Sequence, residues 1–156
     1  MRLLALDLGT STGFCLNVEP LIFGHWDLRP HRYESGGMRY IRFRRKLEEI
    51  NEAYKIDLIA FEEVLFSRTT LAAHVYGGLV ASLMVFCEES KIEYVGVPIG
   101  SWKRHLTGKG NCNKIQVLKT VREKYGLQLQ TFDEADAVGI LFFAVEQYQK
   151  REKKGR

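Results

Sequence analysis

Two short apolar runs, each leading to an acidic residue, constrain the fold of this 156-residue chain more than any other feature. The first run (residues 3–7) ends at Asp7, and a glycine-rich turn follows it. The second run (residues 57–61) leads directly to Glu62. Short apolar runs bounded by turn residues are typical of buried strands. Because a carboxylate at the end of a buried strand is costly unless it is paired or binds a metal ion, the pattern predicts a sheet with an acidic site at its strand ends.

The rest of the chain alternates between strand-like and helix-like patterns. Predicted strands cover residues 3–7, 14–18, 21–28, 57–61 and 92–97, with residues 9–13 as the first turn. Predicted helices cover residues 36–55 (N-cap Ser35), 70–90, 99–106, 114–125 and 132–148. This order predicts an α/β fold with helices on both faces of a mixed sheet, built from a three-stranded antiparallel meander plus two parallel strands. We expect one domain over residues 1–149 and a basic, disordered tail over residues 150–156.

A second pair of acids opens the predicted last helix. Asp133 and Asp136 are three residues apart, so both side chains can face the same way. With Asp7 and Glu62 they form a set of four carboxylates that no histidine or cysteine accompanies. Oxygen-only ligands favour Mg²⁺ or Mn²⁺, and two such ions roughly 3.5–4 Å apart can hydrolyse a phosphodiester, with Asp7 bridging them. The alternative is that Asp133 only caps the helix and that the other acids mark an exposed edge.

Positive charge is clustered in three segments of the chain, whose formal net charge is +4. The first covers residues 29–46, the second residues 101–125 and the third the tail from Lys150. Clustered cations favour a polyanionic partner, because each phosphate that they neutralise releases counterions. The alternative is a set of solvated helix faces, which is common for any single run of charge.

Composition and cysteine spacing exclude several classes of protein. Cys15, Cys87 and Cys112 are far apart and form no CxxC pair, so neither a zinc cage nor a disulfide framework is indicated. The N-terminus lacks the features of a secretory signal. The sequence contains no uninterrupted run of about 18 apolar residues, so no membrane span is expected. These observations predict a protein of the reducing cytosol.

Four motifs resemble, in order, those of the RuvC family of Holliday-junction resolvases. They are ALDLGTSTG around Asp7, IAFEEVLF around Glu62, PIGSWKRHLTGKGNCNKIQV with Lys103 and Lys114, and DEADAVGI with Asp133 and Asp136. The match spans residues 1 to about 145. The resemblance implies a ribonuclease H-like fold, a homodimer, and Mg²⁺-dependent paired nicking of four-way and related branched DNA. It also implies that Lys103 and Lys114 hold phosphate or stabilise charge near the metal ions.

The resemblance and the charge pattern together predict a DNA-contacting set. Its members are Arg44, Arg45, Phe66, Arg68, Lys103, Arg104, Lys109 and Lys114. Phe66, or its neighbour Leu65, stands near the position of an aromatic residue that stacks on junction bases in the family, although either residue could belong to the core. Glu63 and Glu134 depart from the family pattern by adding acids, and the arginine-rich stretch 39–46 suggests a phage-type member. The small residues around Gly77 are a candidate dimer or DNA-facing surface.

Three alternatives remain at this stage. One is a YqgF-type nuclease of the same fold that acts on RNA, which cleavage of folded RNA against a four-way DNA junction would distinguish. Another is a junction-binding protein without catalysis, which the presence of all four acids opposes. The third is a nucleotide-binding fragment of the actin and sugar-kinase superfamily, because DLGTSTG also resembles a phosphate-binding turn. That superfamily needs a second phosphate loop, which this sequence lacks. Neither the preferred cleavage sequence nor a branch-migration partner can be inferred from the sequence.

Overall fold

A mixed five-stranded sheet forms the centre of the protein. The computed structural model describes residues 1–154, and of residues 152 and 153 only the backbone. The strands are β1 (Leu3–Asp7), β2 (Ser11–Leu16), β3 (Ile22–Asp27), β4 (Leu58–Glu63) and β5 (Glu93–Pro98). Their order is β3-β2-β1-β4-β5. Strand β2 is antiparallel to both of its neighbours, β1 and β3, whereas β4 and β5 run parallel to β1. The predicted meander plus two parallel strands is therefore confirmed.

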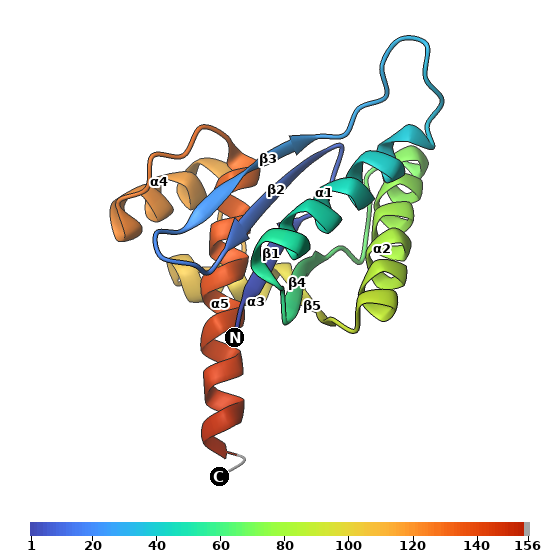
Figure 1. Ribbon diagram of the computed structural model, residues 1–156. Coiled ribbons are helices and arrows are strands. Elements are labelled where there is room, and N and C mark those ends of the chain that lie inside the picture. Colours follow the sequence, from blue (N-terminus) through green and yellow to red (C-terminus); the bar gives the residue numbers. More distant parts are fainter. Residues whose placement is uncertain (155–156) are drawn as a thin grey trace.

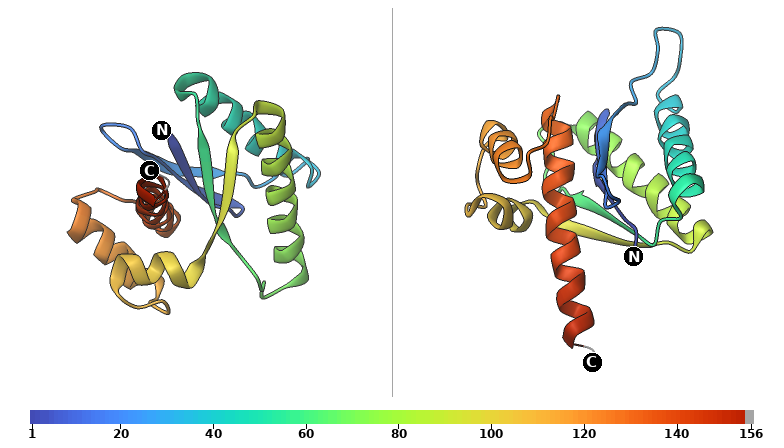
Figure 2. Two further views of the ribbon diagram at one scale, coloured as in Figure 1. Left: turned by 90° about the horizontal axis from the view of Figure 1, so that it is seen from below. Right: turned by 60° about the vertical axis from the view of Figure 1, so that its left-hand side comes forward.

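Helices cover both faces of this sheet, as predicted (Figures 1 and 2). On one face lie α1 (Met38–Tyr54) and α2 (Thr70–Ser90). On the other face α5 (Phe132–Lys154) packs against the sheet, and α3 (Ile99–Thr107) and α4 (Lys114–Tyr125) pack beside it. Strand β1 serves both cores by alternation: Leu4 and Leu6 pack on the α1–α2 side, whereas Leu3 and Ala5 pack on the α5 side.

The start of α5 approaches β2 so closely that a side chain at Gly13 would not fit. A Cβ atom at this position would lie 2.0 Å from the main-chain oxygen of Asp133. Further along α5, a Cβ at Gly139 would lie 2.8 Å from the ring of Trp102. These two glycines let α5 approach both the sheet and α3. Gly13 in particular sets the position of residues 133–136, the DEAD segment at the start of α5.

Several predicted boundaries are wrong, for local reasons. Helix α1 begins at Met38 with Gly37 as its N-cap and without a side-chain cap, so Ser35 does not cap it. The turn after β1 is shorter than predicted because β2 already begins at Ser11. Helix α5 continues through Lys154, so this part of the tail is helical rather than disordered. Residues 155 and 156 lie outside the described part of the chain.

Helix α2 is the most apolar element of the structure. Within residues 1–154 it is the one helix that is long and apolar enough, by length and composition, to cross a membrane. In the structure one face of it packs into the α1–α2 core through Val75, Leu79, Leu83, Phe86 and Cys87. The opposite face is exposed and includes Leu71, Gly77, Ala81 and Val85.

Candidate active site

The four predicted acids meet at one edge of the sheet. Strands β1 and β4 are parallel and in register, with Leu6 opposite Phe61, so the next residues, Asp7 and Glu62, emerge side by side. The start of α5 reaches the same edge, where Ser11 Oγ of β2 donates a hydrogen bond of 2.8 Å to Asp133 Oδ2. Three elements distant in sequence therefore bring their carboxylates together, as the geometry of parallel strands predicts.

These carboxylates lie close enough to repel one another. Burial raises the pKa of Asp7 well above its ordinary value, and the charges of Asp136, Glu62 and Asp133 raise it further. Burial, followed by the charge of Glu62, also raises the pKa of Asp136 to about 7. Because it is unfavourable for these groups to be ionised together, a bound cation would stabilise the charged site.

A tryptophan that sequence reasoning missed orients one of these acids. Trp102 Nε1 of α3 donates a hydrogen bond of 2.8 Å to Glu62 Oε2, and both residues are buried. Burial raises the pKa of Glu62, although the Trp102 hydrogen bond and the charges of Lys103 and Lys114 oppose the shift. No local sequence signal marks Trp102 for this role, since the contact joins residues that are far apart in the chain.

Glu134, the extra acid of the DEAD segment, holds the start of α5 in place. Its backbone N–H donates to Thr131 Oγ1 at 3.2 Å, and its carboxylate accepts from Thr131 N at 3.3 Å and from Gln130 N at 2.6 Å. His25 Nδ1 of β3 lies 3.0 Å from the same carboxylate. Burial raises the pKa of Glu134, but these hydrogen bonds outweigh burial and hold it below its ordinary value. The Thr-x-x-Glu spacing is the capping-box pattern and could have been recognised in the sequence.

The residues present fit a hard divalent cation in donor chemistry and in charge. Asp136 Oδ1 is buried and has no hydrogen-bond partner, which is costly unless a ligand satisfies it. As the side chains stand, no group of three or more His, Cys, Asp or Glu among the described residues is arranged to hold an ion. Side-chain rotations around the buried oxygen would therefore accompany ion binding.

Comparison with known proteins gives the fold and its relatives. No family model matches the chain. A protein of Caldicellulosiruptor saccharolyticus named crossover junction endodeoxyribonuclease RuvC is 28% identical over 151 residues, covering 90% of this chain and 89% of its own. A protein of the same name from Brachyspira hyodysenteriae is 30% identical over 95 residues, covering 61% of this chain and 59% of its own. The chain is thus similar to RuvC proteins, in the first case over 90% of its length.

Solved structures agree with this assignment at the level of the fold. Thermus thermophilus RuvC, in complex with a Holliday junction substrate, superimposes with a TM-score of 0.75 at 22% identity over 90% of both chains. The yeast mitochondrial Holliday junction resolvase superimposes with a TM-score of 0.63 at 14% identity, over 89% of this chain and 75% of its own. The predicted ribonuclease H-like architecture of the RuvC family is thereby confirmed.

The two lysines of the third RuvC-like motif lie near the acids. The charges of Lys103 and Lys114 both lower the pKa of Asp136 and of Glu62. Lys103 Nζ donates to the main-chain oxygen of Cys112 at 3.2 Å and lies 5.6 Å from the centroid of the Trp102 ring. Lys114 is the first residue of α4, and Asn113 and Gln116 form a capping box at that end of the helix. Both lysines are therefore placed where a negative charge at the acids would attract them.

The predicted base-stacking residues of this RuvC-like chain are exposed. Phe66 is 94% exposed and Leu65 is 75% exposed, so neither belongs to the core. They line a cavity of about 400 Å³ that also includes Glu62 and Ile99. Arg68, Arg104 and Lys109 are exposed as well. The structure thus brings the aromatic side chain of Phe66 to the same edge as the acids.

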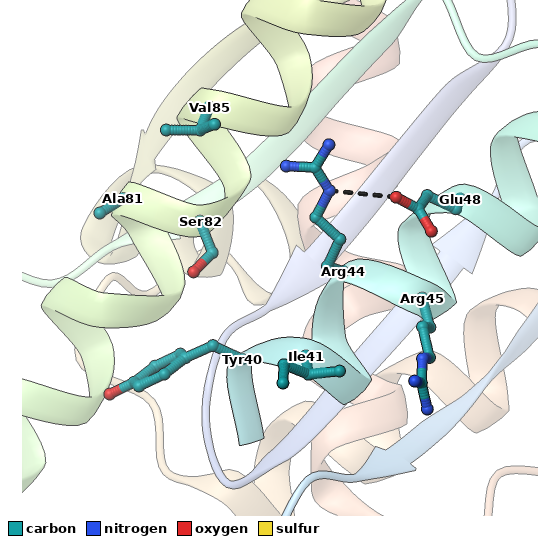
Figure 3. Close-up of a pocket in the computed structure, with 8 residues that line it drawn as sticks. All are labelled: Tyr40, Ile41, Arg44, Arg45, Glu48, Ala81, Ser82 and Val85. Carbon is teal, nitrogen blue, oxygen red and sulfur yellow. Dashed lines mark hydrogen bonds and ion pairs between the residues drawn. The ribbon is translucent and has the colours of Figure 1, made fainter. Parts of the chain in front are cut away.

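The arginines of α1 are less available to DNA than the sequence of this RuvC relative suggests. Figure 3 shows the cavity between α1 and α2, in which Arg44 points toward Glu48. Arg44 pairs with both Glu48 and Glu89 and lies over the ring of Phe86. Arg45 is exposed and forms no ion pair with the described residues. Other cations of the segment are paired too: Arg29 with Asp27, Arg42 with Glu34, and Lys46 with Glu49.

Proposed function

We propose that the protein is a structure-selective DNA endonuclease that resolves Holliday junctions and related branched DNA by metal-dependent, paired nicking. The observation that carries the proposal is that Asp7, Glu62, Asp133 and Asp136 lie close enough for their charges to interact, with Oδ1 of Asp136 buried and unpaired. The names of the two RuvC relatives and the junction-bound Thermus structure support the same activity and substrate.

In this proposal the acids hold two Mg²⁺ ions, and Mn²⁺ also supports activity. When bound, such ions activate a water molecule and stabilise the leaving oxygen of the phosphodiester. Asp7, whose carboxylate interacts with the charges of the other three acids, would hold both ions, and Glu62 and the Asp133–Asp136 pair would complete the two sites. Trp102 orients Glu62 and Ser11 orients Asp133 through the hydrogen bonds given above. Lys103 and Lys114 stabilise the negative charge that develops on the phosphate.

The proposal includes a homodimer, because a two-fold enzyme presents two equal sites to a two-fold substrate. The exposed face of α2 supports it. Leu71 is 72% exposed and Val85 is 51% exposed, and a Cβ at Gly77 would meet nothing within 4 Å. Exposed apolar surface of this kind, with small residues that permit close approach, marks interaction sites.

DNA contacts in this proposal come from the predicted set around the acidic edge. Phe66 stacks on unpaired junction bases, which is worth about 1–3 kcal/mol per base. Lys103, Arg104, Lys109, Lys114 and Arg68 contact phosphates, together with the exposed Arg45, whereas Arg44 would have to leave its two carboxylate partners. We further propose that residues 1–149 act as one nuclease domain, in a cytoplasmic, DNA-associated protein.

The decisive experiment uses purified protein, a synthetic four-way junction and Mg²⁺, with cuts mapped on each strand. We expect symmetric nicks on two strands of the wild type and none with Asp7→Asn, which should still bind the junction because phosphate contacts lie elsewhere. Wild-type-like nicking by Asp7→Asn would refute the metal assignment. Binding without nicking by the wild type would instead indicate a junction-binding protein, and preferential cutting of a folded RNA would indicate an RNA nuclease.

A further inference from the structure

A second cavity adjoins the acidic edge, on the α1–α2 side of the sheet. It measures about 440 Å³ and lies between the turn that follows β1, the loop before α2, and the start of α1. Its lining combines apolar side chains from α2 with Arg39 of α1. It contains one cation and no acid, together with the hydroxyl groups of Thr10, Ser67 and Thr69. Such a lining favours an anion.

Arg39 is the unusual member of this lining. Its Nε atom is buried and has no hydrogen-bond partner, and the residue forms no ion pair with the described part of the chain. By contrast, Arg42 and Arg44 on the same helix are both held by carboxylates. A buried guanidinium nitrogen without an acceptor is costly, and the cost is removed when a ligand supplies the acceptor. An arginine also matches a phosphate better than any other side chain, through paired N–H donors.

The cavity is tied directly to the strand ends that carry the acids. Gly9 follows Asp7 by two residues, so their Cα atoms are at most about 7.6 Å apart. On the other side, the Tyr76 hydroxyl donates to the main-chain oxygen of Glu62 at 2.9 Å and accepts from Val64 N at 3.0 Å. Since successive nucleotides of a DNA strand rise about 3.4 Å, a phosphate in this cavity would be a near neighbour of one held at the acids.

We propose that Arg39, in the cavity between the β1 turn and α2, binds a backbone phosphate one or two nucleotides from the cleaved bond. The inference rests on the proposed nuclease function and adds a binding residue that the charge pattern did not single out. The bound phosphate fixes the path of the strand across the acidic edge. Arg39 contributes affinity and register without reading sequence, because phosphate contacts position a protein but carry no base information.

The test compares Arg39→Gln with Lys46→Gln, which removes an equal charge from the same helix at a residue already paired with Glu49. Junction binding is measured across a salt series in the Asp7→Asn background, so that the DNA stays intact. We expect Arg39→Gln to weaken binding about tenfold and to lower the slope of log affinity against log salt by about one. Lys46→Gln should change neither quantity. Identical behaviour of the two variants would overturn the inference.

Neutral methylphosphonates, placed singly at each position around the cut, locate the contact. The Asp7→Asn protein should lose affinity at several positions, and Arg39→Gln in that background should become insensitive at one of them, near the cut. If Arg39→Gln kept the same sensitivity as Asp7→Asn alone at every position, the inference would again be overturned. If Arg39→Gln melts at a lower temperature, Arg39→Lys replaces it, because lysine keeps the charge but lacks the paired N–H donors of the guanidinium group. Arg39→Lys should restore the salt slope but not the full affinity. Failure of the wild type to bind or cut a junction would refute the proposed function itself, which is a separate outcome.

Discussion

The indole N–H of Trp102 and the carboxylate of Glu62 form a buried hydrogen bond of 2.8 Å, which joins α3 to the end of β4. This contact fixes one carboxylate oxygen of Glu62. A group that orients a metal ligand is nearly as important to a site as the ligand itself, because it sets the geometry in which the ion is held.

Trp102→Phe tests this role, since it removes the N–H and keeps most of the ring. We expect the Mg²⁺ concentration for half-maximal cleavage to rise about 10–100-fold, with a smaller effect at saturating Mg²⁺. The measurement is the initial cleavage rate across a Mg²⁺ titration. Trp26→Phe is the matched control, because Trp26 stacks on Phe14 in the opposite core. An unchanged Mg²⁺ dependence in Trp102→Phe would show that the hydrogen bond does not orient the ligand.

Gly13→Ala should damage the site from β2, which lies on the other side of β1 from Glu62 and β4. The added Cβ would lie 2.0 Å from the main-chain oxygen of Asp133, so either the helix or the strand must move. We expect a loss of stability of about 1–3 kcal/mol, typical of overpacking, and a larger loss of cleavage because Asp133 and Asp136 shift together. Thermal melting and cleavage assays measure the two effects. Gly36→Ala, where the added atom meets nothing within 4 Å, should leave both unchanged.

Glu134→Ala should loosen the start of α5 without removing a proposed metal ligand. The substitution deletes the acceptor for Thr131 N and Gln130 N, and the loss of such a cap costs about 0.5–2 kcal/mol. We expect earlier melting and weaker Mg²⁺ activation, with Glu134→Gln retaining much of both because its amide oxygen still accepts. If Glu134→Ala cleaved normally at limiting Mg²⁺, the cap would be purely a stability device.

Local sequence patterns predicted where the acids lie, but not which residues contact them. The acids at the ends of β1, β4 and α5 could be placed together from sequence, because parallel strands end at one edge and Asp133 and Asp136 share a helix face. The partners of those acids could not, since Trp102 and Ser11 reach them across sequence separations that no periodicity encodes. The arginine-rich stretch misled for the same reason: Arg44 meets Glu89 only after α1 and α2 pack.

The raised pKa values of the acids predict how stability depends on pH and Mg²⁺. The unfolded chain ionises Asp136 near pH 4, whereas the folded chain keeps its proton until about pH 7. The folded state therefore binds more protons between these values, and stability of the metal-free protein falls as pH rises through this window. Asp7, whose pKa is also raised, shifts stability in the same direction.

Asp136→Asn should accordingly stabilise the metal-free protein at pH 8, by on the order of 1–4 kcal/mol, and abolish cleavage. Mg²⁺ should raise the melting temperature of the wild type at pH 8, because an ion that binds only the folded state stabilises it, and should have less effect at pH 5, where protons compete for the same oxygens. Melting curves at pH 5 and pH 8, with Mg²⁺ and with EDTA, give all four values. The prediction fails if the stability of the metal-free wild type does not change across this pH range and Mg²⁺ does not raise its melting temperature at pH 8. In that case the carboxylates neither repel one another in the folded state nor form an ion-binding site.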